Sequence, residues 1–137
     1  MSEIHKCGLL VVRDDGCVLL CRKKRGTRLL ILPGGKLEPG ETQEQCLRRE
    51  LREELSAEAG DLRHIGTYTD VAAGDPARTV RIELYCGTLA QEPVASSEID
   101  ELVWFGPQDD PGQLAPSLRN RVFPDLIRRG MLSWPSG

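Results

Sequence analysis

The 137-residue sequence lacks the features that mark membrane-spanning, secreted or nucleic-acid-binding proteins. It has no apolar run of about 18 residues and no signal-type apolar segment, so neither a membrane span nor export is expected. Its 18 basic and 21 acidic residues leave a net charge of −3. That balance creates no overall field that would attract nucleic acid or an anionic membrane. Any anionic substrate must therefore be met by local charges.

Cysteine pairs at metal-binding or redox spacing are absent as well. The five cysteines are an odd number without a CxxC pair, scattered over expected strands and a helix. This usage is typical of reduced thiols in a protein core and predicts a cytoplasmic location. The two histidines, His5 and His64, have no partner nearby in the sequence and are expected to be structural.

One domain over residues 1–137 is expected from the length, which suffices for one core but not for a second folded module. Apolar runs separated by turn residues predict strands, and Pro124 should kink or split a C-terminal helix. The expected strands are 4–13, 17–23, 28–32, 61–69, 79–89 and 102–105, with helices after residue 42 and at 116–129. Strands interrupted by two helices predict an α/β sandwich with a mixed sheet.

The most informative stretch is 35–57, which places three glutamates on one face of a predicted helix. Glu50, Glu53 and Glu54 fall within an arc of about 100°. Like charges at this spacing repel by a few tenths of a kcal/mol per pair, and a cation bound between them would turn this net repulsion into a net attraction. Clustered carboxylates suit Mg²⁺ or Mn²⁺ better than zinc. The alternative is a solvated helix face, because arginines are interleaved with the glutamates.

A glycine loop before this helix favours the metal-site interpretation. Gly34 and Gly35 follow an apolar run at 29–32. Thr42 and Gln45 then form a capping box that starts the helix. The helix can dock on a sheet through an apolar stripe of residues spaced by four, Leu47, Leu51 and Leu55. The order strand, glycine loop, helix thus predicts carboxylates that face the edge of a cleft.

These residues match the pattern G-x5-E-x7-R-E-U-x-E-E-x-G-U, in which U is an aliphatic residue. The matching residues are Gly35, Glu41, Arg49, Glu50, Leu51, Glu53 and Glu54. This pattern is the signature of the Nudix hydrolases, and the sequence resembles that family. One position departs, because Ser56 stands where the family has a glycine that ends the helix. The resemblance implies an α/β fold, the Nudix-type α/β/α sandwich with a central mixed sheet.

The resemblance also implies an activity and a metal. Nudix hydrolases cleave a nucleoside diphosphate linked to another group, by attack of water on a phosphorus of the pyrophosphate. By this likeness Arg49 and Glu41 form a buried structural pair. The implied cofactor is Mg²⁺, with Mn²⁺ as an alternative, and its implied ligands are the Gly34 carbonyl, Glu50, Glu53 and Glu54.

The sequence leaves the general base open. Some relatives take a glutamate from the loop before a strand that carries a tryptophan, which makes Glu98 the first choice. Glu101 and Glu83 are alternatives, and Glu53 could itself serve as the base. The acidic run around Glu98 could also be a solvated turn, because a base must lie within about 3 Å of the attacking water. The predicted catalytic residues are Glu50, Glu53 and Glu98.

Phosphate contacts are expected from the basic run at 22–25, near the end of the second expected strand. Strand alternation allows only half of these side chains to face the cleft. Arg22 is the position most like the family's substrate arginine. Lys36, in the glycine loop, is the second predicted substrate-binding residue, although an exposed loop lysine is the alternative.

Markers of particular substrates are missing. Ala72 and Gly74 stand where the subfamilies for ADP-ribose and dinucleoside polyphosphates carry a proline and a tyrosine. The small size, the glycine loop and the pair Trp104-Phe105 resemble the nucleoside triphosphate pyrophosphatases. This predicts a (d)NTP or an oxidised dNTP as the substrate. Asn120 could read an oxidised guanine, as an asparagine does in that group, or it could be a surface residue.

Three interpretations therefore stay open. The first is hydrolysis of a (d)NTP to monophosphate and pyrophosphate, and the second is an ADP-ribose or nucleotide-sugar pyrophosphatase. The third is a non-catalytic Nudix module that binds a nucleotide. Catalysis is favoured because all three glutamates of the helix are present, whereas degenerate members lose one. The expected partner is a small nucleotide and neither a nucleic acid polymer nor a membrane, and the chain is expected to be a monomer or homodimer.

Overall fold

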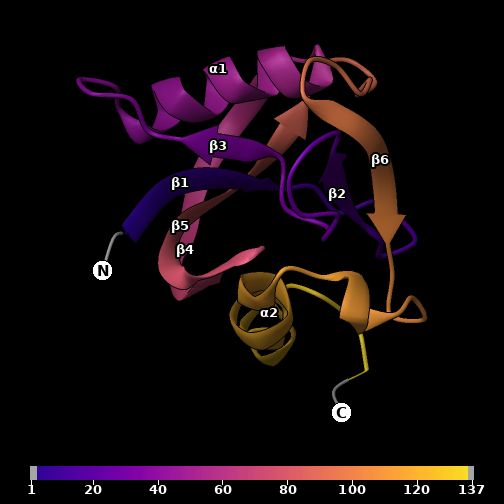
Figure 1. The fold of residues 1–137 in the computed structure, drawn as a ribbon. Coiled ribbons are helices and arrows are strands. Elements are labelled where there is room, and N and C mark those ends of the chain that lie inside the picture. The colour runs from indigo at the N-terminus through magenta and orange to yellow at the C-terminus, as the bar shows by residue number, and fades with distance from the viewer. Residues whose placement is uncertain (1–2, 136–137) are drawn as a thin grey trace.

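The computed structural model describes residues 3–135. Its elements in chain order (Figure 1) are β1 (Glu3–Leu10), β2 (Val18–Lys23), β3 (Gly34–Lys36), α1 (Gln43–Leu55), β4 (Ala59–Ala72), β5 (Asp75–Leu89), β6 (Ile99–Phe105), the 3-10 turn η1 (Pro111–Gln113), the π-helical turn η2 (Leu118–Val122) and α2 (Phe123–Arg128). Within this part of the chain, no helix is long and apolar enough to cross a membrane. All five cysteines are free thiols.

The strands form a mixed four-stranded sheet in the order β3-β1-β5-β4 and a separate antiparallel pair, β2-β6. In the larger sheet β1 and β5 are parallel, whereas β1 pairs with β3 and β4 pairs with β5 in antiparallel fashion. In Figure 1, α1 lies above the sheet and α2 below it. The chain therefore adopts the expected α/β sandwich with a central mixed sheet.

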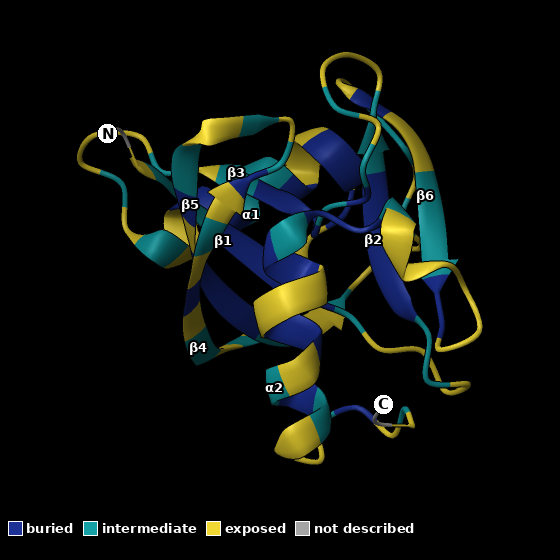
Figure 2. Cartoon of the chain, turned by 60° about the horizontal axis from the view of Figure 1, so that its bottom comes forward, coloured by how far each residue is buried: buried dark blue, intermediate teal, exposed yellow. Residues whose placement is uncertain are grey.

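Each helix buries one apolar face against the sheet. The predicted stripe of α1 is confirmed, because Leu47, Leu51 and Leu55 are fully buried in a cluster with Leu9 and Tyr85. On the opposite face of the sheet, a second cluster joins the C-terminal helical segment to β5, and it includes Leu118, Val122, Leu126, Val80, Ile82 and Leu84. Figure 2 shows the buried side of α2 turned toward the sheet and its outer side exposed.

Both ends of α1 follow from local chemistry. Thr42 accepts from the Gln45 backbone N–H at 3.1 Å, and the Gln45 side chain accepts from the Thr42 N–H at 2.9 Å. The predicted capping box is therefore confirmed. Ser56 ends the helix in the left-handed conformation, with φ 52° and ψ 39°. Serine thus takes the backbone conformation that glycine adopts without a steric penalty, and the helix still ends at this position.

The expected strand at 28–32 is wrong. Its backbone changes partner from one residue to the next: Ile31 pairs with Cys21 of β2, and Leu30 pairs with Leu114. A regular ladder needs one partner strand along several residues, so only isolated bridges form. The glycine loop itself becomes the strand β3, in which Gly34 pairs with Gly8 of β1.

The other expected elements are present with shifted bounds. The hairpin after β1 turns at residues 14–16 as expected, but β1 and β2 belong to different sheets. Just beyond β1, Val12 forms a bridge with Val18, and the Leu19 N–H donates to the Val11 carbonyl. The C-terminal helix is distorted before Pro124, as expected. There the Phe123 N–H donates to the Leu118 carbonyl five residues back, which makes the π-helical turn η2. Pro124 has no N–H for a regular helical bond, so the ladder is interrupted at this point.

Candidate active site

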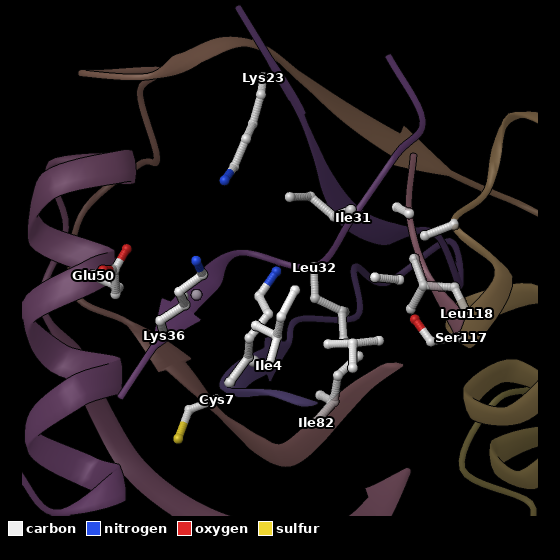
Figure 3. A pocket seen from close by; sticks show the side chains of 18 of the residues that line it. Ile4, Cys7, Lys23, Ile31, Leu32, Lys36, Glu50, Ile82, Ser117 and Leu118 are labelled. Atoms are coloured by element: carbon white, nitrogen blue, oxygen red, sulfur yellow. The ribbon is translucent and has the colours of Figure 1, made fainter. Parts of the chain in front are cut away.

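A cavity of about 420 Å³ lies between the glycine loop with α1 on one side and the start of the C-terminal helical segment on the other. This volume is within the range of about 300–1,000 Å³ that is usual for small-molecule sites. Figure 3 shows two unlike ends: Glu50, Lys23 and Lys36 lie toward α1, whereas Ser117 and Leu118 lie at the far end. The cavity thus joins a charged end to a largely apolar end.

Glu54 anchors the charged end to the glycine loop. Its carboxyl is buried, with 6% of the residue exposed, and its Oε1 accepts from the Gly34 N–H at 2.9 Å. Burial is the main cause that raises the pKa of Glu54 to about 7; the Gly34 N–H opposes this rise, and the neighbouring Glu50 charge contributes to it. A cation at this end of the cavity would favour the ionised form of the carboxyl.

Glu50 also lines the cavity, and its carboxylate receives the Arg49 Nη1–H at 2.7 Å. Partial burial raises the pKa of Glu50, an effect that Arg49 opposes. Glu53 is not among the lining residues; its side chain is 54% exposed and lies 3.6 Å from Arg49 Nη1. Between residues 3 and 135, no three His, Cys, Asp or Glu side chains are close enough to hold an ion as they stand. Glu50 and Glu53 would need to turn away from Arg49 to converge with Glu54.

Arg49 holds the glycine loop to the helix. Its guanidinium donates to both carboxylate oxygens of Glu41, at 2.7 and 2.9 Å, and to the Lys36 carbonyl at 3.2 Å. The Arg49 hydrogen bonds, together with the Glu38 N–H, lower the pKa of Glu41 to about 2. The structural pair expected between Arg49 and Glu41 is therefore confirmed, and it lies beside the cavity without lining it.

The cavity receives lysines and not the expected arginine. Lys23 and Lys36 line it, together with Lys6 of β1. Arg22 points away: it donates to Glu101 at 2.6 Å, to the Arg28 carbonyl and to Gln113. Neighbouring residues of a regular strand face opposite sides, and the β2–β6 register shifts between Arg22 and Lys23; of the two, Lys23 faces the cavity. The position of Arg22 gives no support to its predicted role in substrate binding.

Lys6 was missed by the sequence analysis. It lies opposite Lys36 in the β1–β3 register and is partly buried beside Lys23, Glu50 and Glu54. Burial and the Lys23 charge lower the pKa of its ammonium group, and the two carboxylates oppose that shift. The available signal was weak, because the first half of β1 also holds Glu3 and His5; Lys6 stands out only as a lysine directly before the buried half of the strand.

Of the candidate bases, Glu98 alone lines the cavity outside α1. Its own backbone carbonyl accepts from the Lys24 N–H at 2.9 Å, which holds the loop before β6 against the end of β2. Glu101 is paired with Arg22. Glu83 does not line the cavity; it accepts from Thr67 at 2.7 Å and is bonded to both histidines, His5 and His64. The histidines therefore have a shared structural partner, as expected for structural residues.

The Glu83 cluster predicts an acid-sensitive contribution to stability. Burial alone would raise the pKa of Glu83, but hydrogen bonds from Thr67, His5 and His64 outweigh it and lower the pKa to about 2. A carboxyl with a lowered pKa stabilises the fold above its unfolded-state pKa, near 4.5, and this contribution is lost as the pH falls toward 2. Glu83→Gln is expected to lower the free energy of unfolding at pH 7 by at most about 3 kcal/mol, with the difference vanishing near pH 2.

Urea titrations of wild type and Glu83→Gln across this pH range would check the prediction. Glu58→Gln is the control, because Glu58 is half exposed in a surface pair with Arg52. A surface pair of this kind contributes little to stability. A destabilisation of Glu83→Gln that is the same at pH 7 and pH 2 would contradict the assigned role of the carboxylate charge.

The comparison with known families decides the class of the site. The NUDIX domain family matches residues 6–126, a range that contains the glycine loop, α1 and the described cavity. This chain belongs to the Nudix family. It is accordingly a Nudix hydrolase, an enzyme of the pyrophosphohydrolase type. Glu41, Arg49 and Glu50 occupy the family's signature positions.

Similar proteins include enzymes that are named for different activities. Nucleoside triphosphatase NudI of Escherichia fergusonii is 33% identical over 116 residues, which cover 72% of this chain and 79% of that protein. NAD-capped RNA hydrolase NudC of Vibrio atlanticus is 30% identical over 104 residues, 75% of this chain. The matched part of this chain spans only 38% of the length of that NudC.

Solved structures share the fold over nearly the whole chain. The E. coli ORF135 protein has a TM-score of 0.74 at 28% identity, with 96% of this chain and 94% of that chain covered. MutT protein from Methanosarcina mazei Go1 has a TM-score of 0.73 at 23% identity, with 94% and 96% covered. The second likeness concerns the fold alone.

Proposed function

We propose that this Nudix hydrolase cleaves a nucleoside triphosphate to the monophosphate and pyrophosphate, with Mg²⁺ as the cofactor. The observation that carries the proposal is the cavity itself. Its charged end combines Glu50 and Glu54 with Lys6, Lys23 and Lys36, and its other end is largely apolar. A polyphosphate with an organic group at one end matches this division of charge.

The donor set fits Mg²⁺. Glu54 and Glu50 both line the cavity beside Gly34, and Glu53 follows on the same helix. These are hard oxygen donors, and no cysteine or histidine belongs to the set, which disfavours zinc. The proposed ligands are Glu50, Glu53, Glu54 and the Gly34 carbonyl. When bound, the ion supplies charge neutralisation at the phosphates and a lower pKa for water.

The protein's own side chains would then bind the phosphates and accept the proton of the attacking water. Lys6, Lys23 and Lys36 bind phosphate oxygens and offset their charge. Water attacks a phosphorus, its oxygen forms the new P–O bond, and the bond to the bridging oxygen breaks so that pyrophosphate leaves. Glu98 is the proposed acceptor of the water's proton because it lines the same cavity. Glu53 remains the alternative base.

Two considerations support a triphosphate over the other nucleotides. NudI, which the chain resembles over 79% of its length, is named a nucleoside triphosphatase. NudC is named an NAD-capped RNA hydrolase, but the chain spans little more than a third of it. The sequence markers for ADP-ribose and dinucleoside polyphosphates are missing. The free thiols support the expectation of a reducing, cytoplasmic environment.

The test is a panel of the canonical (d)NTPs, oxidised dNTPs, ADP-ribose, nucleotide sugars and NAD⁺, incubated with the purified chain and Mg²⁺. Products are separated by ion-exchange chromatography. Monophosphate and pyrophosphate from a triphosphate are the expected products. Paired monophosphates from ADP-ribose, a nucleotide sugar or NAD⁺, without turnover of any triphosphate, would exclude the proposed substrate class. Tight nucleotide binding without any turnover would leave the non-catalytic module.

A further inference from the structure

Two serines adopt a backbone conformation that side chains disfavour, and both lie where α1 meets the loop before β6. Ser56, at the end of α1, has φ 52°, and Ser97, directly before Glu98, has φ 56°. Apart from glycines, Asp61 is the only other residue between positions 3 and 135 with a positive φ. This conformation costs free energy in a residue that carries a Cβ, and such strain is frequent at functional sites. The side chain at position 56 should therefore make a contact that glycine could not make.

The Ser56 side chain bonds the loop that carries Glu98. Its hydroxyl oxygen lies 2.8 Å from the hydroxyl oxygen of Ser96. The Ser96 hydroxyl in turn donates to the Val94 carbonyl at 3.2 Å. Because a hydroxyl carries one hydrogen, the Ser56 hydroxyl is the donor in its bond to Ser96. A glycine at position 56 would leave this bond unmade.

Backbone hydrogen bonds hold the same loop on two sides. The N–H groups of Val94 and Ser96 donate to the carbonyls of the last two residues of α1, each at 2.9 Å. On the other side, the Lys24 N–H donates to the Glu98 carbonyl at 2.9 Å. Figure 1 shows the loop before β6 beside the C-terminal end of α1. Glu98 thus lies between the end of β2 and the end of the helix that carries Glu54.

The turn that presents Glu98 is short and strained. The Ile99 N–H donates to the Ser96 carbonyl at 3.0 Å, which closes a tight turn around Ser97 and Glu98. The left-handed conformation of Ser97 has to be held by contacts from outside the turn. The Ser56 hydroxyl supplies such a contact at the first residue of the turn. Without it, only the fraction of molecules that keep this turn geometry would place Glu98 correctly.

We propose that Ser56 is a positioning residue for Glu98 and acts through the hydroxyl of Ser96. It ties the turn that carries the proposed proton acceptor to the helix that carries the proposed metal ligands Glu53 and Glu54. A general base must lie within hydrogen-bonding reach of the attacking water, so the position of the turn relative to the helix governs how well Glu98 can act. This inference rests on the proposed function, in which Glu98 accepts the proton.

Two substitutions separate the hydroxyl from the backbone conformation at position 56. Ser56→Ala and Ser56→Gly both remove the hydroxyl, but only glycine relieves the left-handed conformation. Both variants are expected to lower kcat about fivefold, the equivalent of about 1 kcal/mol, with KM unchanged because Glu98 is not proposed to bind the phosphates. The melting temperature of the glycine variant should exceed that of the alanine variant by about 4 °C.

Steady-state kinetics, with the nucleotide that the wild type turns over fastest, and thermal melts provide the two measurements. A purely structural role of Ser56 would make activity follow stability. A Ser56→Gly protein as active as the wild type, with loss of activity confined to the less stable Ser56→Ala, would overturn the inference.

Asp61 provides a matched control for the backbone. It has φ 53°, lies in β4 and is not among the residues that line the cavity. Asp61→Ala and Asp61→Gly should differ in melting temperature in the same direction as the two Ser56 variants, and both should keep the wild-type kcat. A fivefold loss of kcat in either Asp61 variant would indicate a general effect of backbone strain and would contradict the assigned role of the Ser56 hydroxyl.

A double-mutant cycle tests whether Ser56 acts through Glu98. Glu98→Gln alone is expected to lower kcat about a hundredfold or more. Ser56→Ala should cause no further loss in the Glu98→Gln background, and Ser96→Ala should add nothing to Ser56→Ala. Losses that multiply independently, or a Glu98→Gln protein with the wild-type kcat, would overturn the inference while leaving the proposed reaction in place.

Amide hydrogen exchange tests the position of the turn without any substrate. The Ile99 N–H, which closes the turn, is expected to exchange about fivefold faster in Ser56→Ala and Ser56→Gly than in the wild type, and at the wild-type rate in both Asp61 variants. Faster exchange without turnover of any triphosphate would refute the proposed reaction and support the contact that holds the turn. Triphosphate turnover with unchanged exchange and unchanged kcat in both Ser56 variants would do the reverse.

Discussion

Glu53→Gln is expected to lower kcat about a thousandfold, or about 4 kcal/mol of transition-state stabilisation, without changing the stability of the fold. Glu53 is proposed as a metal ligand and as an alternative base, and glutamine removes the charge that both roles need. The Glu53 side chain should contribute little to the stability of the fold, because it is 54% exposed and its ion-pair partner, Arg49, is 3.6 Å away. Steady-state kinetics with a (d)NTP and a thermal melt check the prediction.

Helix α1 offers a closely matched control in Glu44. Its side chain is 55% exposed and lies 3.7 Å from Arg48, again four residues away on the helix. Glu44→Gln therefore makes the same chemical change at a similarly exposed glutamate, but in the first turn of the helix, away from Glu50 and Glu54, which line the cavity. We expect wild-type kcat and melting temperature. Equal loss of activity in both variants would point to helix electrostatics instead of a specific site.

Gly34→Ala is expected to lower the free energy of unfolding by at least about 3 kcal/mol, the largest stability effect predicted for this chain. Gly34 has φ +140°, a conformation that residues with a side chain rarely adopt. A Cβ added there would overlap the Cys7 carbonyl oxygen and lie 2.9 Å from the Gly8 Cα. These are backbone atoms of β1, so no side-chain rotation can relieve the overlap. Urea denaturation provides the measurement.

Two other glycines make the comparison specific. In Gly35→Ala the new Cβ would overlap the Glu50 carboxylate, which is the end of a flexible side chain and can move. That variant should remain folded but lose activity at least tenfold, because a proposed ligand is displaced. Gly40 has φ +80° with nothing within 4 Å of an added Cβ, so Gly40→Ala should cost about 1 kcal/mol and keep its activity.

The three glycine variants together would contradict the structural account if they behaved alike. A Gly34→Ala protein as stable as Gly40→Ala would mean that β3 does not pack on β1 in the described register. A fully active Gly35→Ala protein would mean that the position of Glu50 is not critical. The two outcomes can be told apart, since the first concerns stability and the second concerns turnover.

Much of the stretch 35–57 could be predicted from the sequence because its contacts are local. The capping box of Thr42 and Gln45 spans three residues, and the pair of Arg49 and Glu41 spans eight. The apolar stripe of α1 follows from helical periodicity, which the backbone imposes on any helix. The family signature lies in the same stretch, so the class of enzyme was also accessible without coordinates.

The partners of the remaining site residues were decided by tertiary structure. Arg22 was preferred over Lys23 for its likeness to the family's substrate arginine, since strand alternation alone does not say which face of β2 meets the cavity. Lys6 was overlooked, since its neighbours Glu50 and Glu54 lie on a helix more than forty positions away in the chain. Glu83 was considered as a base, whereas His5, at a separation of 78 residues, helps to hold it in a structural cluster.

The sequence by itself determined the helix that carries the glutamates, its caps and its buried face, because these depend on residues within a few turns of one another. Only the tertiary structure decided which lysines line the cavity and that aliphatic side chains with Ser117 line the far end of the cavity. It also decided that residues 28–32 form isolated bridges and no regular strand. Those properties depend on strand register and on the packing of the C-terminal segment across the sheet. Such contacts join distant parts of the chain, and no local pattern encodes them.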